Sequence, residues 1–331
     1  MRTHLAGLLR RNALPRPPAS ASAPPPATPP TLHSGFRTGL LRRDAPALPP
    51  AKRVRTGRPA VLAAAAALLA GACGVGVSAE ESVADKDSLV IGVNSDQPGL
   101  STPQGDHGYT GFDVDVARDI ARRLGATVTF QPVSSRTREV LLQKGDVDLV
   151  VASYSITPER KTEVAFAGPY YVAKQDILVR ESDAGAVKNV RDLAGKRLCR
   201  VSGSNSYPRV QEEKGVAVLP AAATGYDDCL RKLSGGSLDA VSTDDLILAG
   251  LAAKAAKSGS GGPPLRMVNA PFSDEPYGVG IARGDLDGCE AVNKAITEMY
   301  QDGTAARLLK TWFGPVGLNV ATTVPQFEGC D

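Results

Sequence analysis

Short apolar runs alternate with amphipathic segments along the chain from residue 88 onward. The runs at 88–93 and 147–151 are rich in Val, Leu and Ile, which is typical of strands buried in a parallel sheet. Between them, residues 113–124 place apolar residues on one face of a helix and aspartates in its first turn. This alternation predicts an α/β fold.

A second series of strands and helices follows an extended segment at 170–180. Two α/β units joined by extended segments imply two lobes with a cleft between them. The further strands that we expect are 126–131, 196–201, 238–243 and the extended segment 277–282. The further helices that we expect are 136–145, one near 225–236, 245–257, and two near 286–301 and 304–312.

The positive charge of this 331-residue chain is concentrated near its N-terminus. Residues 1–72 hold 11 of the 38 Lys and Arg residues but only one of the 35 Asp and Glu residues. The remaining 27 basic and 34 acidic residues give residues 73–331 a net charge of −7. This balance does not indicate binding to nucleic acid or to an anionic membrane surface.

The stretch AKRVRTGRPAVLAAAAALLAGAC at 51–73 has basic residues, an apolar segment too short to span a bilayer, and then small residues. It resembles a bacterial lipoprotein signal. That resemblance implies that Cys73 is lipidated and anchors the mature chain to the outer face of the cell membrane. An ordinary secretory cleavage site with an incidental cysteine is the alternative. Residues 1–51 are rich in Pro, Ala and Arg and are not expected to fold.

The sequence ASYSITPER at 152–160 follows one of the apolar runs. Thr157 suits the N-cap of a helix, and Pro158 suits the first helical position, where its missing N–H costs nothing. Arg160 is therefore expected in the first turn of a helix at the carboxyl end of a strand. In open α/β sheets this is the edge where ligands bind.

Three ordered blocks of sequence resemble the family 3 bacterial solute-binding proteins, which serve polar amino-acid ABC importers. The blocks are GFDVDVARDIARRL (111–124), LLQKGDVDLVVASYSITPERKTEVAFAGPYY (141–171) and LDAVSTDDLILAG (238–250). The resemblance extends over about residues 88–315, and the glutamate-binding lipoproteins of actinobacterial importers are the most similar type. It implies a two-lobed periplasmic-binding-protein (type II) fold with two hinge strands, no cofactor, and a permease and an ATPase as partners.

In such a fold one lobe is built from two segments of the chain and the other lobe is inserted between them, and we expect a monomer. The expected divisions are 1–72 (N-terminal extension and signal peptide), 73–87 (tether), 88–175 (lobe 1, first segment), 176–276 (lobe 2), 277–318 (lobe 1, second segment) and 319–331 (C-terminal tail).

The resemblance assigns Arg160 to the α-carboxylate of an amino-acid ligand. A planar guanidinium suits that group because it can make two charge-assisted hydrogen bonds. Ser153 and Ser155 match strand-end positions that contact the ligand's ammonium or carboxylate. The alternative for Arg160 is that it caps a neighbouring strand or pairs with Glu159.

Lobe 2 is expected to supply the remaining contacts to the α-groups. Residues 202–206, SGSNS, can form a nest of backbone N–H groups for an anion, and Ser204 and Asn205 match the family's second carboxylate contact. A plain βα turn is the alternative there. Asp244 matches the family's ammonium-binding aspartate. Alternatively, Asp244 and Asp245 only cap the helix that follows.

Arg138 corresponds to an arginine that acidic-amino-acid binders of this family place near the cleft, where a second guanidinium compensates a distal carboxylate. Glutamate is therefore the expected ligand, ahead of aspartate or glutamine. Arg136 and Arg200 are competing candidates, and a solvated arginine on an exposed helix face is the alternative. Thr243 is expected to touch the ligand side chain. The loop at 94–101 lacks the aromatic residue that often covers the ligand in this family.

Four cysteines remain after Cys73, and an even number in an exported chain suggests two disulfides with three possible connectivities. The pairs Cys199–Cys229 and Cys289–Cys330 are expected because each then lies within one segment of the fold. The spacings are too wide for a zinc ribbon, and His107 is the only histidine after the signal, so no metal site is expected.

The sequence after the signal contains no CxxC, no P-loop and no Gly-x-Ser-x-Gly motif, and a single histidine does not favour a Ser-His-Asp site. A binding protein is therefore expected rather than an enzyme. A periplasmic dehydratase of the cyclohexadienyl or arogenate type, built on the same fold, is the main alternative. A stand-alone signalling ectodomain is a third possible function.

Overall fold

The computed structural model of this chain describes residues 81–106, 108–258 and 262–330. The expected signal peptide, Cys73, the first part of the tether and His107 lie outside the described residues. In the described part, no helix combines the length and the apolar character needed to cross a membrane.

Strands and helices follow the alternating order expected from the sequence. The strands are β1 (Ser88–Asn94), β2 (Thr102–Gln104), β3 (Gly108–Thr110), β4 (Thr127–Val133), β5 (Leu149–Val150), β6 (Ala165–Arg180), β7 (Arg197–Val201), β8 (Leu219–Ala223), β9 (Val241–Asp244), β10 (Leu265–Met267) and β11 (Ser273–Ile281). The α-helices are α1 (Phe112–Leu124), α2 (Arg138–Gln143), α3 (Pro158–Lys161), α4 (Ser206–Pro208), α5 (Tyr226–Ser234), α6 (Asp245–Lys257), α7 (Leu286–Gln301) and α8 (Thr304–Phe313). Short helical turns are η1 (Glu181–Asp183), η2 (Val190–Leu193), η3 (Arg209–Glu213) and η4 (Gly314–Val316).

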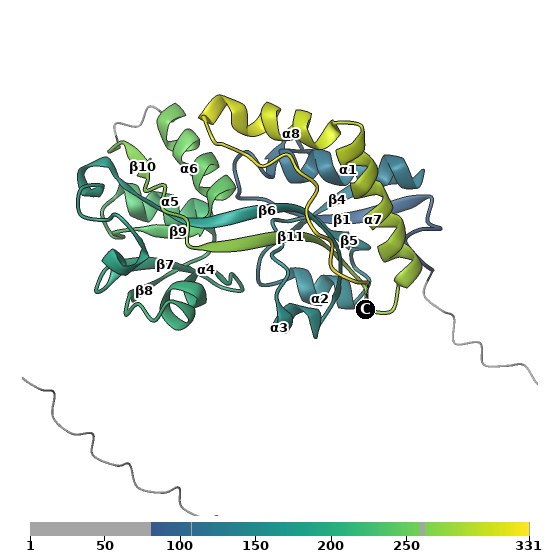
Figure 1. Cartoon of the computed structure of the whole chain (residues 1–331), viewed down its shortest axis with the longest axis horizontal. Helices are drawn as coiled ribbons and strands as arrows, with labels where there is room; N and C mark the ends of the chain where they lie inside the picture. The colour runs from purple at the N-terminus through teal and green to yellow at the C-terminus, as the bar shows by residue number, and fades with distance from the viewer. Residues whose placement is uncertain (1–80, 107, 259–261, 331) are drawn as a thin grey trace, which may run out of the picture. The chain divides into compact units, whose positions relative to one another are not determined.

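A seven-stranded sheet runs through the described domain in the order β10-β6-β11-β5-β1-β4, with β9 paired to β6 (Figure 1). Strand β1 lies between β4 and β5 and is parallel to both, as expected for consecutive βα units. In the second lobe, β7 and β8 form a separate parallel pair. A bridge between Leu198 and Ala240 connects β7 to the residue that precedes β9.

The antiparallel strands β6 and β11 connect the two lobes. The 16-residue β6 pairs with β11 from Ala165 to Gln175 and with β9 from Gln175 to Leu178, so it leaves the first lobe and enters the second. The two expected hinge strands are therefore present. The expected lobe boundaries at 175/176 and 276/277 fall inside β6 and β11, and they stay predictions.

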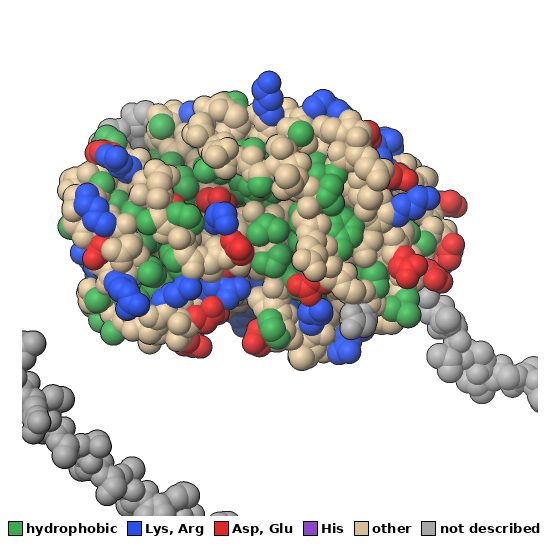
Figure 2. Space-filling model, in the orientation of Figure 1, with side chains coloured by type: hydrophobic (Ala, Val, Ile, Leu, Met, Phe, Trp, Pro, Cys, Tyr) green, Lys and Arg blue, Asp and Glu red, His purple; other side chains and the backbone are tan. Residues whose placement is uncertain are grey.

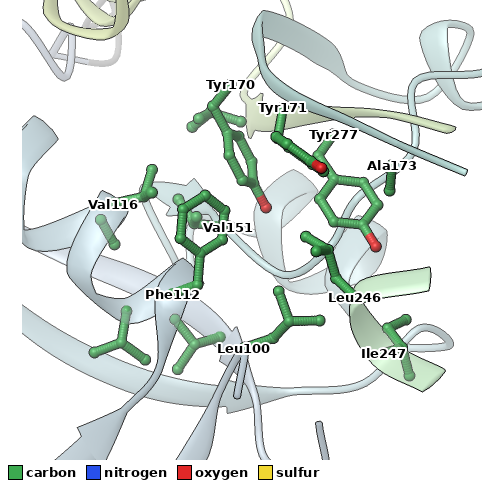
Figure 3. Packing of buried hydrophobic residues seen from close by; sticks show 14 of the residues in the cluster. Leu100, Phe112, Val116, Val151, Tyr170, Tyr171, Ala173, Leu246, Ile247 and Tyr277 are labelled. Carbon is green, nitrogen blue, oxygen red and sulfur yellow. The ribbon is translucent and has the colours of Figure 1, made fainter. Parts of the chain in front are cut away.

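Aromatic side chains pack where the hinge strands pass between the lobes (Figure 3). Tyr170 and Tyr171 of β6 lie against Tyr277 of β11, with ring centroids 5.9 Å and 6.3 Å apart. Phe112, the first residue of α1, lies 6.2 Å from each of the two β6 rings, and Leu246 of α6 is buried in the same cluster. Because large apolar surfaces are buried here, the cluster stabilises both hinge strands.

Both expected disulfides are confirmed. Cys199–Cys229 links β7 to α5, and Cys289–Cys330 links α7 to the C-terminal tail. The tail is also held by an ion pair of 2.8 Å between Lys161 and Glu328. The tail is thus fastened to the first lobe near α3.

Three expected elements are shorter than the sequence pattern indicates, and one of them, the strand expected at 238–243, forms only β9. The helix expected at 136–145 spans only α2, because the residues before it form a turn closed by the Thr137 hydroxyl, which accepts from the Ser134 N–H at 3.0 Å. The run at 147–151 pairs only over β5, because the chain turns away at Ser153, whose φ of 43° lies in the left-handed region.

Candidate functional site

A small cavity lies between the lobes. Each residue on its wall ends or follows one of the strands β1, β4, β5, β7, β8 and β9, so the cavity lies at the carboxyl edge where α/β sheets bind ligands. The wall consists of Gln97, Ser135, Arg138, Ser153, Arg160, Ser204, Asn205, Ser206, Tyr226, Asp244 and Ile247. Six of the eight expected ligand residues are in this set, and the other two, Ser155 and Thr243, are not.

Arg160 is positioned by the short helix α3. The Thr157 hydroxyl caps this helix and accepts from the Arg160 N–H at 3.3 Å, as expected. The guanidinium donates to the Ser155 carbonyl at 2.7 Å and, across the cavity, to the Gly203 carbonyl at 3.1 Å. Burial and then the charge of Arg138 lower the pKa of Arg160 to about 10, so it stays protonated at neutral pH. The bond to Ser155 caps a strand end, and the cavity-facing position leaves Arg160 available to a ligand anion.

Arg138 is buried rather than solvated, with its side chain 3 % exposed. Its guanidinium carbon lies 3.8 Å from the centroid of the Tyr154 ring, and Nη1 donates to the Ala152 carbonyl at 3.3 Å. Its Nε lies 3.4 Å from Oε1 of Glu139, which also accepts from the Tyr154 hydroxyl at 2.8 Å. The stacking fixes a second positive charge on the lobe 1 wall.

Asp244 ends β9 and is buried. Its Oδ2 accepts from the Tyr277 hydroxyl at 2.7 Å, whereas its Oδ1 has no hydrogen-bond partner among the described residues. Burial, and then the charge of Glu275, raise the pKa of Asp244 well above its ordinary value. Asp244 occupies the N-cap position of α6, but its side chain makes no capping bond; the Asp245 carboxylate accepts from the Leu246 N–H instead, at 2.8 Å. A buried, unpartnered carboxylate oxygen suits a cationic ligand group.

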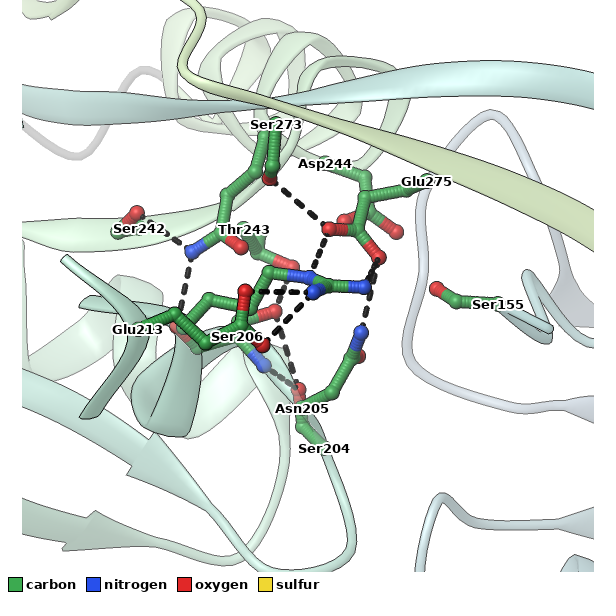
Figure 4. A network of polar contacts seen from close by, with 12 residues as sticks. Ser155, Ser204, Asn205, Ser206, Glu213, Ser242, Thr243, Asp244, Ser273 and Glu275 are labelled. Atoms are coloured by element: carbon green, nitrogen blue, oxygen red, sulfur yellow. Dashed lines mark hydrogen bonds and ion pairs between the residues drawn. The ribbon is translucent and has the colours of Figure 1, made fainter. Parts of the chain in front are cut away.

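The loop Ser204–Ser206 forms the facing part of the lobe 2 wall (Figure 4). The Ser204 hydroxyl contacts the Tyr226 hydroxyl at 3.0 Å and donates to the Ser206 hydroxyl at 3.1 Å. Asn205 turns its amide toward the hinge strand and donates to Oε2 of Glu275 at 2.8 Å. The side chains of this loop are therefore held in place by contacts within the protein.

Thr243 and Ser155 do not line the cavity, but each contacts a residue that does. The Thr243 hydroxyl is 2.9 Å from the Ser206 hydroxyl and 2.8 Å from the Tyr226 hydroxyl. Ser155 is buried and offers its carbonyl to Arg160. Their expected contacts with the ligand stay predictions, and here both residues support wall residues.

Ser153 is held by two neighbours. Its backbone N–H donates to the Asp113 carboxylate at 2.7 Å, and its hydroxyl donates to Oε1 of Gln97 at 2.8 Å. Burial raises the pKa of Asp113 to about 7, although the Tyr170 hydroxyl donates to the carboxylate at 2.9 Å. This carboxylate stabilises the left-handed backbone of Ser153.

Four wall residues were not predicted from the sequence, namely Gln97, Ser135, Tyr226 and Ile247, and a fifth, Ser206, was included only as part of the stretch 202–206. Their place after a strand could have indicated some of them. Gln97 follows β1 and Tyr226 follows β8, so both lie at the same edge as the residues that were predicted. The competing candidates Arg136 and Arg200 do not line this cavity.

The wall brings together two guanidinium groups, one carboxylate and several hydroxyls. Such a set can hold a small zwitterion through opposite charges at fixed positions. Within the described ranges, no group of three or more His, Cys, Asp or Glu side chains is placed to hold a metal ion.

Comparison with known proteins identifies relatives over most of this chain. Residues 89–315 match the family model of bacterial extracellular solute-binding proteins, family 3. The glutamate-binding protein GluB of Corynebacterium efficiens is 36% identical over 266 residues, which cover 75% of this chain and 88% of GluB. The solved structure of an ancestral arginine-binding protein bound to arginine has a TM-score of 0.63 at 31% identity and covers 69% of this chain and 99% of that one. The ancestral amino acid-binding protein AncCDT-1, a precursor of cyclohexadienyl dehydratase, has a TM-score of 0.61 at 30% identity and covers 69% of this chain and 96% of its own.

The solved structures confirm the expected two-lobed type II fold. The family match spans both hinge strands and every residue of the cavity wall. This chain therefore belongs to the bacterial extracellular solute-binding proteins of family 3.

Proposed function

We propose that this chain captures an acidic amino acid outside the cytoplasm and delivers it to an ABC importer, with glutamate as the first candidate and aspartate or glutamine next. The observation that carries this proposal is the charge of the cavity wall. The guanidinium groups of Arg138 and Arg160 face the single carboxylate of Asp244. Of the wall residues, two side chains are positive and one is negative, and this excess complements a ligand whose net charge is −1 even though Glu139, behind the wall, pairs with both arginines.

Arg160 and Asp244 suit the two α-groups. Arg160 would hold the α-carboxylate through charge-assisted hydrogen bonds, and backbone N–H groups of the loop Ser204–Ser206 would add donors. The Oδ1 atom of Asp244 would accept from the α-ammonium, which gives this buried oxygen the partner it lacks. Ser153, at the strand end between them, would contact the same groups.

Arg138 suits the distal carboxylate. Its carboxylate contact within the described residues is Glu139, at 3.4 Å from Nε. A ligand carboxylate would supply the charge-assisted pair that a buried guanidinium needs, whereas an amide would not. Glutamine would therefore bind less tightly than glutamate, and aspartate, one methylene shorter, would reach Arg138 less well.

The relatives support this choice of ligand class. GluB is a glutamate-binding protein, and its similarity to this chain supports glutamate. The ancestral arginine-binding protein has the same fold but was solved with arginine. Because one fold serves ligands of opposite side-chain charge, the cavity wall is the better guide to specificity.

A thermal-shift panel of the twenty amino acids tests the proposal. A ligand that binds only the native state raises its stability, so glutamate should give the largest rise in Tm for the wild-type protein. A panel in which a basic or an apolar amino acid gives the largest rise would contradict the acidic assignment.

The second candidate function is the dehydratase. The observation that favours it is the similarity to AncCDT-1, a precursor of cyclohexadienyl dehydratase. AncCDT-1 is itself an amino acid-binding protein, and the family consists of binding proteins, so we propose that this chain carries out no chemistry. Incubation with arogenate tests this directly, since formation of an aromatic product would establish the alternative.

We also propose that lipidated Cys73 anchors a monomeric binding domain to the outer face of the cell membrane. The sequence around Cys73 is the support for this proposal. Detergent phase partition of the full-length protein tests it, because Cys73→Ser should move the protein from the detergent phase to the aqueous phase.

A further inference from the structure

A buried ion pair connects a hinge strand to the lobe 2 wall of the cavity (Figure 4). Glu275 of β11 is 0 % exposed, and its Oε2 accepts from Asn205 at 2.8 Å and from Nη2 of Arg209 at 3.3 Å. Nε of Arg209 forms an ion pair with the other oxygen, Oε1, which also accepts from the Ser273 hydroxyl at 2.9 Å. A carboxylate can be buried here because Arg209 compensates its charge.

The other hinge strand reaches the same loop. Gln175 of β6 is also fully buried, and its Nε2 donates to the Ser206 carbonyl at 2.8 Å and to the Ser242 hydroxyl at 3.0 Å. Each hinge strand thus holds one residue of the loop Ser204–Ser206. The geometry of this loop depends on the hinge as well as on its own turn.

Glu275 also acts on Asp244 through its charge. Besides burial, the groups that shift the pKa of Asp244 are the Glu275 and Asp245 carboxylates, which raise it, and the Tyr277 hydroxyl and Arg160, which lower it. Figure 4 shows the Glu275 and Asp244 carboxylates on the same side of the network. Glu275 therefore influences both the loop and the proposed ammonium acceptor, although it does not line the cavity.

We propose that Glu275 is a positioning residue for ligand binding: paired with Arg209, it holds the Asn205 amide and thereby keeps the loop Ser204–Ser206 in the geometry that receives the ligand. This inference rests on the proposed function, because it concerns the same cavity. It makes ligand affinity depend on a hinge residue that touches no ligand.

The substitution Glu275→Gln tests the inference because it keeps the side-chain volume and one acceptor oxygen but removes the ion pair. Glu213→Gln is a matched control, since Glu213 pairs with the same Arg209 at 2.7 Å, has a side chain 51% exposed and makes no bond to Asn205. Calorimetry uses the amino acid that the wild-type protein binds best in the thermal-shift panel. We expect Glu275→Gln to weaken binding by about tenfold or more, the loss typical of a hydrogen bond to a charged group, and Glu213→Gln to stay within about twofold.

A pH profile of the dissociation constant distinguishes an effect of Glu275 on the binding site from a general loss of protein stability. Affinity should fall as the pH decreases through the pKa of Asp244, because a protonated Asp244 no longer attracts an ammonium group. Removing the charge of Glu275 removes one cause that raises this pKa, so the fall should move to lower pH in Glu275→Gln. The fall should stay where it is in Glu213→Gln.

The inference is overturned if folded Glu275→Gln binds within about twofold of the wild type, or if its pH profile is unchanged. If Glu275→Gln does not fold, Arg209→Lys replaces it, because lysine keeps the charge but cannot pair with both oxygens of Glu275. Retained affinity in folded Arg209→Lys also overturns the inference. A wild-type protein that binds none of the twenty amino acids would overturn the proposed function and this inference together, whereas unchanged binding in the variants overturns the inference alone.

Discussion

Arg160 and Arg138 lie on the same wall of the cavity but are held in different ways. Arg160 donates to a carbonyl in each lobe, those of Ser155 and Gly203. Arg138 stacks on Tyr154 and donates only within lobe 1. Arg160 therefore takes part in the contact between the lobes and suits the α-carboxylate common to all ligands. Arg138 suits the ligand side chain, which differs from one amino acid to another.

The first prediction concerns the α-groups. Arg160→Ala and Asp244→Ala should each abolish binding of every amino acid, because each removes one member of a buried charge pair with the ligand, a loss of about 3–5 kcal/mol. Calorimetry measures the affinity, and circular dichroism confirms that the domain stays folded. Affinity retained within about threefold in either folded variant would refute the α-group assignment.

The second prediction concerns the side-chain specificity. Wild-type protein should prefer glutamate to glutamine by about ten- to a hundredfold, the value of a charge-assisted pair. Arg138→Met should remove most of that preference, because it deletes the charge and keeps the length of the stem. Calorimetry of both proteins with both ligands closes a thermodynamic cycle. A coupling energy near zero would mean that Arg138 does not meet the distal group.

At the scale of elements, the sequence predicts best the helices whose first residues include a helix-capping or helix-starting residue. Helix α6 spans the expected residues 245–257, and Thr157 caps α3 as expected. The length of β5 was not predictable, because its end depends on Asp113, which is about forty residues earlier in the chain and accepts from the Ser153 N–H. The local sequence pattern therefore predicts that a helix or strand is present, whereas contacts with distant residues determine where some of these elements end.

This contact between α1 and the end of β5 gives the third prediction. The folded protein holds the proton of Asp113 more tightly than the unfolded chain, because burial raises its pKa from 3.8 to about 7. Its contribution to stability is therefore full below the unfolded pKa and is lost as the pH rises through the folded pKa. Between about pH 5 and about pH 8, the wild type should lose about 3 kcal/mol of stability relative to Asp113→Asn, which does not titrate.

Urea denaturation at the two pH values measures this difference. Asp115→Asn, in the same first turn of α1 but with a partly exposed side chain, is the control and should show no such change. If the difference in unfolding free energy between the wild type and Asp113→Asn is the same at both pH values, the carboxyl group does not titrate in this range.

At the scale of the whole molecule, the lobes meet through residues that no local pattern marks. The Asp96 carboxylate, after β1, accepts from the Tyr226 N–H at 2.6 Å, although the two residues are 130 positions apart in the chain. Gln97 and Tyr226 line the cavity close to this contact but carry no motif of their own, so neither was predicted from the sequence. Arg160 and Asp244, which were predicted, lie in sequence blocks that resemble the family.

Three lobe 2 glycines allow the lobes to approach this closely. A Cβ atom at Gly203 would lie 2.2 Å from the Ser135 carbonyl oxygen, and one at Gly225 would lie 2.0 Å from Oδ2 of Asp96. A Cβ atom at Gly250, in the interior of α6, would lie 1.7 Å from the carbonyl oxygen of Pro98. Since a backbone carbonyl cannot rotate away as a side chain does, a side chain at Gly250 does not fit this arrangement of the lobes.

The fourth prediction follows from Gly250. Gly250→Ala should weaken ligand binding by about tenfold or more, although alanine is the better helix former by about 1 kcal/mol, because a Cβ atom there collides with the Pro98 carbonyl in this arrangement of the lobes. Small-angle scattering should show that the wild type becomes more compact with ligand while Gly250→Ala does not. Gly185→Ala is the control, since a Cβ atom there has no neighbour within 4 Å, and it should bind like the wild type. If Gly250→Ala binds with wild-type affinity and compacts with ligand, the contact between α6 and Pro98 does not limit closure.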